Sequence, residues 1–355
     1  MTSYSAMDAI SPAIERTKYF LFKPFRLGRF LKLALVACFA EGSYSGFNSN
    51  FNIPFPGKTP EHVPFQIPQV HWPDPGIMIA IAAVILIFFV PLTILISYLL
   101  IRLRFSYFDC VLYGHDQITP GWRKYHRQAL RYLGVNLLIG LAFLAVLAAM
   151  GIVVWQRYKE VFMDLAAGNK AHVQVDLMSL LPAIALAFLI LFVMGIVGYI
   201  VQSAMTYFVL PRMALEDASI SRSFADVWDD MKSEPGQFAL FLLMRMLLAI
   251  AAGLIAMIAL LLPIVILGVI GVVIGLVVHA TVHSTVALVV LAVVGALILA
   301  AVLFVCAISI GGTIGTFTRN YGLLFYAGRY PELGALLLPA PPVPGFPVVR
   351  PGEVL

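Results

Sequence analysis

Charged residues are scarce in this chain. Only 12% of its 355 residues are Asp, Glu, Lys or Arg, whereas 61% are hydrophobic; ordinary soluble domains have about a quarter charged residues. A compact soluble fold of this length has too little interior to bury so much apolar surface. The composition therefore excludes a soluble globular protein and predicts an all-α integral membrane protein, because helices satisfy their own backbone groups in lipid.

Cysteine is also scarce. The three cysteines, Cys38, Cys110 and Cys306, fall on separate segments without Cys-x-x-Cys spacing, which excludes a disulfide framework and a thiolate metal site. The sequence Leu35-Val36-Ala37-Cys38 fits the pattern that lipoprotein peptidases cut before a lipidated cysteine. The apolar stretch continues past Cys38, however, and this favours an uncut span with a buried thiol.

Catalytic motifs are missing. The chain has no Gly-x-x-x-x-Gly-Lys-Ser/Thr loop, no His-Glu-x-x-His and no Gly-x-Ser-x-Gly, and in 42–46 a tyrosine stands where the nucleophile would be. We therefore expect a non-enzymatic protein without a cofactor. The net charge of +5 is spread over short segments between apolar runs, so it does not indicate a nucleic-acid partner.

Six apolar runs meet or approach the length of about 20 residues that a helix needs to cross a bilayer. The first is the weakest because it contains Lys32 and Glu41. The predicted spans are Leu27 to Gly46, Gly76 to Ile101, Tyr132 to Trp155, Leu180 to Leu210, Gln237 to Leu262 and Thr285 to Gly312.

Basic residues predict the orientation of these spans. Of 23 Lys and Arg residues, only Lys58, Arg157, Lys159 and Lys170 fall in the loops opposite the N-terminus. Positively charged loops stay in the cytoplasm, so we expect both termini there. A seventh span would reverse the C-terminal segment, and we therefore expect the apolar stretch 263–278 to be re-entrant or interfacial.

A weak internal repeat accompanies the spans. Ser11-Pro12, Thr119-Pro120 and Ser221-Arg222 each open a short segment of basic, acidic and aromatic residues that precedes two apolar runs. We expect three units, about 11–101, 119–210 and 221–312, each an amphipathic interfacial helix capped by Ser or Thr and followed by a two-span hairpin. They form one membrane domain, residues 1–338.

Two proline-rich segments interrupt this pattern. The outer loop 47–75 is expected to be an extended strap that either binds a partner or covers its own helices. The tail 339–355 is expected to be disordered and cytoplasmic.

Polar groups within the apolar runs are the candidate site, because each is costly in lipid. Arg245, Asn136 and Gln202 lie at comparable depth in three spans and can form a pocket in the inner leaflet. The planar guanidinium of Arg245 would bind a lipid phosphate there, or it would snorkel to bulk headgroups. Glu41 is expected near the outer interface, with a proton-coupling role as the alternative.

A pair of histidines is a weak metal candidate. His279 and His283 stand four residues apart, which puts both imidazoles on one helix face. A third ligand would have to come from the other outer loop, where the candidates are His62, His71, Glu61 and Asp74. The alternative is that both histidines are polar residues ending a helix at the interface.

One loop carries a family resemblance. Leu210-Pro211, Leu215-Glu216-Asp217, Ser219-Ile220, Ser223-Phe224 and Trp228 are followed by a Pro-Gly turn and a new span. This pattern resembles the recurring loop of a bacterial superfamily that contains the membrane domain of glycerophosphodiester phosphodiesterases and the uncharacterised YciC-like proteins. The resemblance implies a bacterial inner-membrane protein concerned with envelope or lipid handling. It carries no hydrolase activity over, because that activity belongs to a separate soluble barrel.

Three functions remain open. The leading expectation is a lipid-interacting scaffold or an accessory subunit, with membrane lipids, membrane proteins or further copies of this chain as partners. The second is a lipid or small-molecule transporter with a polar path through Arg245, Asn136, Gln202 and Glu41. The third, a membrane-embedded metal enzyme, would use the outer histidines.

Overall fold

The fold is all-helical. The computed structural model describes residues 4–42, 75–166, 177–281 and 285–338, and this part of the chain contains no strand. Its helices are α1 (Ile10–Phe22), α2 (Leu27–Gly42), α3 (Pro75–Tyr113), α4 (Thr119–Lys124), α5 (His126–Ala166), α6 (Leu177–Ala204), the π-helix η1 (Met205–Val209), α7 (Leu210–Glu216), α8 (Ile220–Ser233), α9 (Pro235–Thr281), α10 (Thr285–Ala327) and α11 (Pro331–Leu337).

Five of these helices are long and apolar enough to cross a membrane. The candidate spans are Ala83–Tyr113, His126–Lys159, Ile184–Glu216, Pro235–Val278 and Val289–Ala327. Each exceeds the roughly 20 residues that hydrocarbon requires, so their ends extend beyond it. The five helices indicate a multi-pass membrane protein.

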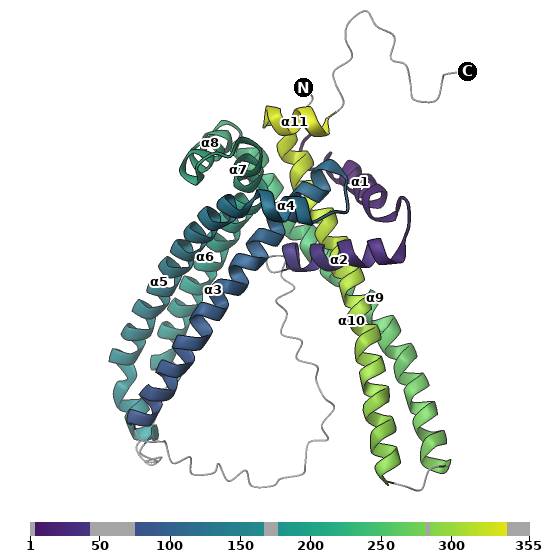
Figure 1. Cartoon of the computed structure of the whole chain (residues 1–355). Helices are drawn as coiled ribbons and strands as arrows, with labels where there is room; N and C mark the ends of the chain where they lie inside the picture. The colour runs from purple at the N-terminus through teal and green to yellow at the C-terminus, as the bar shows by residue number, and fades with distance from the viewer. Residues whose placement is uncertain (1–3, 43–74, 167–176, 282–284, 339–355) are drawn as a thin grey trace, which may run out of the picture.

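The first predicted span, Leu27 to Gly46, is not among them. Its described part is α2, a helix of 16 residues that lies across α10 instead of alongside it (Figure 1). Six spans are therefore not confirmed. The physical reason is that the apolar side of α2 is buried against protein, with Ala34, Ala37 and Ala40 inaccessible to solvent.

The stretch 263–278, expected to be re-entrant or interfacial, forms no segment of its own in the structure. These residues are the second half of α9, which continues through Pro263 as one helix to Thr281. Phe241 near the start of α9 stacks on Tyr321 and Phe325 near the end of α10, with ring centroids 5.1 and 4.5 Å apart. The start of α9 is thus level with the end of α10, and the later part of α9, which includes 263–278, extends away from this contact (Figure 1).

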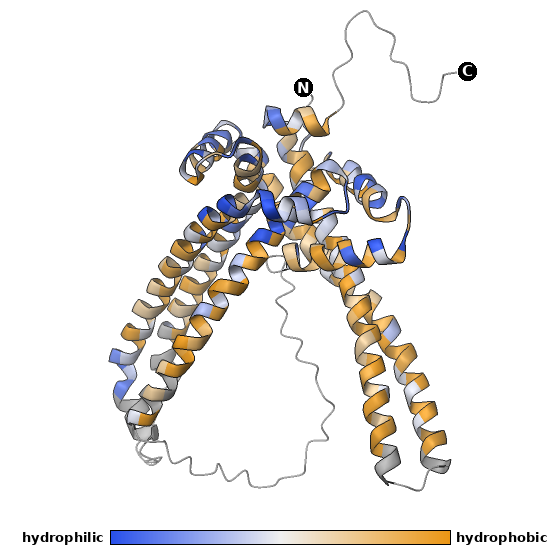
Figure 2. Cartoon of the chain, in the orientation of Figure 1, coloured by the Kyte–Doolittle hydropathy of each residue, from blue (hydrophilic) through white to orange (hydrophobic). Residues whose placement is uncertain are grey.

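The molecule divides into a packed end and five bare arms. We call the packed end the bundle; it consists of α1, α2, α4, η1, α7, α8, α11 and the adjoining ends of the long helices, and it contains nearly all buried residues. The arms are the remaining parts of α3, α5, α6, α9 and α10, whose large side chains are mostly exposed. Figure 2 shows hydrophobic arms and hydrophilic residues gathered at the bundle.

The arms form two groups that diverge from the bundle (Figure 1). The first group is α3, α5 and α6, and the second is α9 and α10. Both described ends of the chain, α1 and α11, lie at the bundle. The proline-rich loop, from 47 to 74, and the tail, from 339, lie outside the described residues.

Small residues permit the crossing of α2 and α10. A Cβ at Gly312 would overlap the backbone of Ala34, and one at Gly315 would lie 3.1 Å from the carbonyl oxygen of Ala37. Close approach of this kind is what small residues spaced along a helix allow. By contrast, the glycines in the second half of α9 have no atom within 4 Å of an added Cβ; they are Gly268, Gly271 and Gly275.

Short helices begin near the three predicted repeat starts, but their caps differ. The residues before α1 and α4, Ala9 and Ile118, make no side-chain cap, and Ser11 and Thr119 lie inside the helices. Only Ser219, before α8, accepts a hydrogen bond from the backbone N–H of Arg222. The three-unit repeat is not confirmed, since the first unit lacks its first span.

Candidate functional site

A buried polar cluster joins the two arm groups within the bundle. We call it the polar junction; it consists of Glu41, Arg104, Tyr107, Tyr199, Ser203, Thr206, Tyr207, Arg245, Thr316 and Arg319. Three of its members are guanidinium groups, and one is a carboxylate. Burying charges costs free energy unless each is paired and hydrogen-bonded, so the contacts of each charge decide what the cluster can do.

Glu41 and Arg319 form a buried ion pair. The carboxylate of Glu41 lies against the guanidinium of Arg319, and the two side chains are 2% and 0% exposed. Tyr207 donates to the second carboxylate oxygen over 3.4 Å. This pair fixes the end of α2 on α10.

Arg245 is held by one hydroxyl and two aromatic rings. It donates to the hydroxyl of Ser203, and its guanidinium lies 4.5 Å from the ring centroid of Tyr207 and 5.1 Å from that of Tyr199. A cation over the face of an aromatic ring is stabilised by the ring's quadrupole. Arg245, a candidate site residue from the sequence, is thus enclosed between α6, η1 and α9.

The π-helix η1 lies at the centre of the polar junction. All five of its residues are buried, and the carbonyl oxygen of Thr206 accepts from Arg319 over 3.0 Å. The ring of Tyr207 occupies the space that a side chain at residue 322 would need, so Gly322 is required there. A π-helical turn inside a longer helix often marks a functional position, and here it presents Tyr207 to both Arg245 and Arg319.

Further hydrogen bonds cross between the arm groups. Tyr107 on α3 and Thr316 on α10 share one over 2.7 Å, and Tyr199 on α6 donates to the carbonyl oxygen of Leu242 on α9 over 3.1 Å. Arg104 on α3 donates to the carbonyl oxygen of Ala40 on α2 over 2.8 Å. The polar junction therefore fastens the first arm group to the second.

The arm of α10 is by itself long enough to cross a bilayer before the helix reaches the polar junction. Gly311, where α10 meets Cys38 of α2, lies 22 residues beyond Val289, which is roughly 33 Å at 1.5 Å per residue. A hydrocarbon core is about 30 Å thick. Arg319 lies two further turns along the helix, and its ion pair with Glu41 is buried within the protein.

The structure brings three of the four predicted site residues to this region. Arg245 and Glu41 both contact Tyr207, and Gln202 precedes Ser203 with its side-chain nitrogen buried and without a hydrogen-bond partner among the described residues. Asn136 is half-buried on α5, which packs on α3 and α6. Glu41, expected near the outer interface, is buried where α2 ends inside the bundle.

The histidine pair receives no support as a metal site. His279 lies near the end of α9, and His283 is outside the described residues, as are His62, His71, Glu61 and Asp74. Within the described part of the chain, no group of three His, Cys, Asp or Glu side chains could hold a metal ion.

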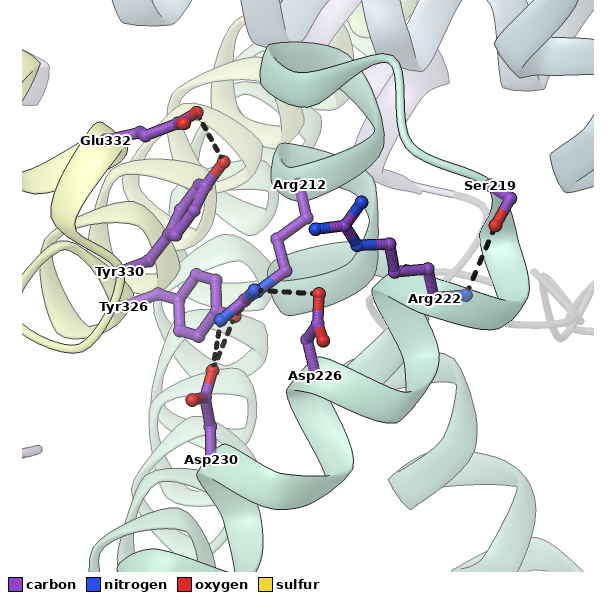
Figure 3. A network of polar contacts seen from close by, with 8 residues as sticks. All are labelled: Arg212, Ser219, Arg222, Asp226, Asp230, Tyr326, Tyr330 and Glu332. Atoms are coloured by element: carbon purple, nitrogen blue, oxygen red, sulfur yellow. Dashed lines mark hydrogen bonds and ion pairs between the residues drawn. The ribbon is translucent and has the colours of Figure 1, made fainter.

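A second polar network holds α8 on the end of the bundle (Figure 3). Arg212 donates to Asp226 over 3.2 Å, to Asp230 over 2.7 Å and to the hydroxyl of Tyr326 over 2.6 Å. Tyr330 donates to Glu332 beside it, and burial together with the carboxylates of Glu216 and Glu332 raises the pKa of the Tyr330 phenol above its ordinary value. This network ties α7, α8, α10 and α11 together.

Sequence reasoning missed Arg319, Arg104 and Tyr207. The two arginines were counted as orienting charges because they fall near the ends of apolar runs. A signal for Arg319 does exist: Gly311, Gly315 and Arg319 repeat every four residues on α10. The small residues of α2 and Glu41 follow a similar helical spacing.

The fold and its composition define an all-helical, multi-pass membrane protein. Residues 4–336 match a family described as a family of unknown function (DUF7544), and the chain belongs to that family. No curated protein and no solved structure matches the chain.

Proposed function

We propose that the protein is a non-enzymatic scaffold of a bacterial inner membrane, which binds lipid and holds a larger membrane assembly together. The observation that carries this proposal is the contrast between the bare arms and the packed bundle. Large apolar patches on a protein mark a surface that something else covers. In a bilayer that cover is lipid, or the spans of another protein chain.

The contacts within the polar junction favour a fastening role. Arg245 and Arg319 are both engaged by oxygen atoms and aromatic rings of the chain itself. Such contacts hold the helices in a fixed arrangement. They engage both arginines with the chain itself, so neither guanidinium is presented to a substrate moving along the arms.

The distribution of basic residues supports a cytoplasmic bundle. Among the described residues, only Arg157 and Lys159 lie towards the far ends of the arms, and the positive-inside rule keeps the more basic side in the cytoplasm. Both termini are then cytoplasmic. The loop after Tyr207 resembles that of a bacterial superfamily associated with envelope and lipid handling, and this resemblance supports an inner-membrane location and a lipid-related role.

Photo-crosslinking from the arms tests the scaffold. A crosslinking amino acid at Phe88 on α3 or Ile255 on α9, both exposed, should capture another membrane protein or a second copy of this chain in intact cells. The same group at the buried Phe241 is the matched control and should capture only the chain itself. Arm positions that capture lipid alone would contradict a role in assembly.

A transporter is the second candidate, and one observation favours it. Arg245 contacts Ser203 where the two arm groups meet, the neighbouring Gln202 has a buried side-chain nitrogen without a hydrogen-bond partner among the described residues, and a lipid headgroup entering between the groups would arrive there. Purified protein in liposomes should then accelerate the exchange of a fluorescent phospholipid between leaflets, and Arg245→Met should abolish the acceleration. The scaffold proposal expects exchange no faster than in protein-free liposomes.

A further inference from the structure

The turn between α1 and α2 presents exposed aromatic and basic side chains together. Tyr19, Phe25 and Leu27 are 67%, 58% and 63% exposed, and Phe22 stacks on Phe25 and on the buried Phe30 with centroids 6.2 and 5.4 Å apart. Because Phe30 anchors these rings in the core, the aromatic surface is formed before any partner arrives. We call residues 18–27 the aromatic turn.

The basic residues of the aromatic turn lack acidic partners. Lys18, Lys23 and Arg26 are exposed, and none of them forms an ion pair within the described part of the chain. Lys23 lies over the ring of Tyr19 at 5.8 Å. No Asp or Glu occurs between residues 16 and 40, so this surface carries positive charge, which favours binding to an anionic partner.

Two contacts fix the level of the aromatic turn along α10. Thr17 accepts a hydrogen bond from Asn320 of α10 over 3.0 Å, and Ala34 lies against Gly312. Gly312 is 23 residues beyond Val289, or roughly 35 Å along the helix, against a hydrocarbon thickness of about 30 Å. The segment between these contacts therefore emerges from the bundle at the height of the lipid headgroups.

We infer that the aromatic turn is a binding surface for anionic phospholipid in the leaflet next to the bundle. Its rings enter the boundary between headgroups and acyl chains, where Tyr and Trp concentrate in membrane proteins. Lys18, Lys23 and Arg26 contact the phosphates. The inference rests on the proposed scaffold role, because it assumes that the bundle sits on the membrane surface, and it adds the lipid class and the residues.

Titration with phosphatidylglycerol tests the charge requirement. Each basic residue near an anionic surface contributes about 1 kcal/mol, so the double variant Lys23→Gln/Arg26→Gln should raise the apparent Kd for phosphatidylglycerol in phosphocholine detergent micelles about thirty-fold. The control Arg222→Gln/Lys232→Gln removes the same charge from α8, on the end of the bundle away from the arms, and should change the Kd little. Equal loss in both variants, or no loss in the first, overturns the inference.

A fluorescent probe tests the insertion of the rings. The three native cysteines are first replaced by alanine, and thermal unfolding is used to show that this variant is folded. Phe25→Cys is then introduced, and an environment-sensitive bimane fluorophore is attached to the new cysteine. Its emission should shift to shorter wavelength in nanodiscs that contain phosphatidylglycerol and much less in phosphatidylcholine alone. Emission typical of water in both overturns the inference, while crosslinking from the arms still reports on the scaffold independently.

Discussion

The bundle and the arms use the same apolar residues for different purposes. In the bundle, Phe208, Phe238, Phe241 and Phe325 form a cluster with ring centroids between 4.5 and 6.1 Å apart, and the buried Glu41 and Arg319 form an ion pair. In the arms, the large Leu, Ile, Val and Phe side chains are mostly exposed. The bundle is also less hydrophobic along the sequence than the arms (Figure 2), and it differs from them further in its small residues, its stacked aromatic rings and its hydrogen-bonded charges.

The ion pair in the bundle gives the largest expected effect. Arg319→Met leaves the carboxylate of Glu41 buried without its partner, and it should lower the free energy of unfolding by about 3–5 kcal/mol. The double variant Glu41→Leu/Arg319→Met should recover most of this loss. Leu297→Ala, an exposed position on the arm of the same helix, should change it by less than about 0.5 kcal/mol. Thermal unfolding of detergent-solubilised protein measures the stability of all three variants. Equal stability of Arg319→Met and wild type would contradict the difference proposed between the bundle and the arms.

A pair of glycine substitutions on α10 sharpens the comparison. Gly312→Ala places a Cβ on the backbone of Ala34 and should destabilise the crossing by about 1–3 kcal/mol. Gly295→Ala has no neighbour within 4 Å of the added atom and should be neutral or stabilising by up to about 1 kcal/mol, because alanine favours helix more than glycine does. Thermal unfolding of both variants tests this prediction. Equal changes in stability for Gly312→Ala and Gly295→Ala would contradict the packing of α2 on α10 at Gly312.

The network around Arg212 should contribute less, because it is partly exposed. Arg212→Lys keeps the charge but loses the planar fork that reaches Asp226 and Asp230 together. We expect a loss of about 1 kcal/mol and faster amide hydrogen exchange in α8, with no change in the arms. Exchange that rises equally in both regions would show that α8 is not held by these contacts.

The smallest predicted effect is a response to alkaline pH. Burial and the hydrogen bond to Asp109 raise the pKa of Tyr125 above its ordinary value of about 10. The stability from the neutral phenol is therefore fully present below pH about 10 and is lost as the pH rises further, because the unfolded chain ionises first. Tyr125→Phe should flatten this alkaline decline; an unchanged slope would contradict the assignment.

The membrane class and the positions of most apolar helices could be predicted from the sequence, because long apolar runs have few alternatives. The role of α2 could not, since an apolar helix that packs on protein has the same hydropathy as a short span. α9 is longer than a bilayer requires, and the contacts of Phe241 with Tyr321 and Phe325, which no local pattern specifies, show that its start lies beside the end of α10.

The candidate site was predictable in part. The cost of a charge in an apolar run made Glu41 and Arg245 candidates, and in the structure both contact Tyr207. Their ring and ion-pair partners come from η1 and the far end of α10, more than a hundred residues away from Glu41. No local pattern in a single sequence specifies contacts of that separation.

The orientation of α2 tests the central account most directly. Nitroxide labels at Gly28, Lys32, Leu35 and Phe39, all exposed, would be placed one at a time in nanodisc-bound protein, and their depths measured by oxygen and nickel accessibility. A helix lying in the membrane plane across α10 predicts nearly equal depths. A steady change of roughly 16 Å from residue 28 to residue 39, as in a helix that crosses the bilayer, would contradict the division into bundle and arms.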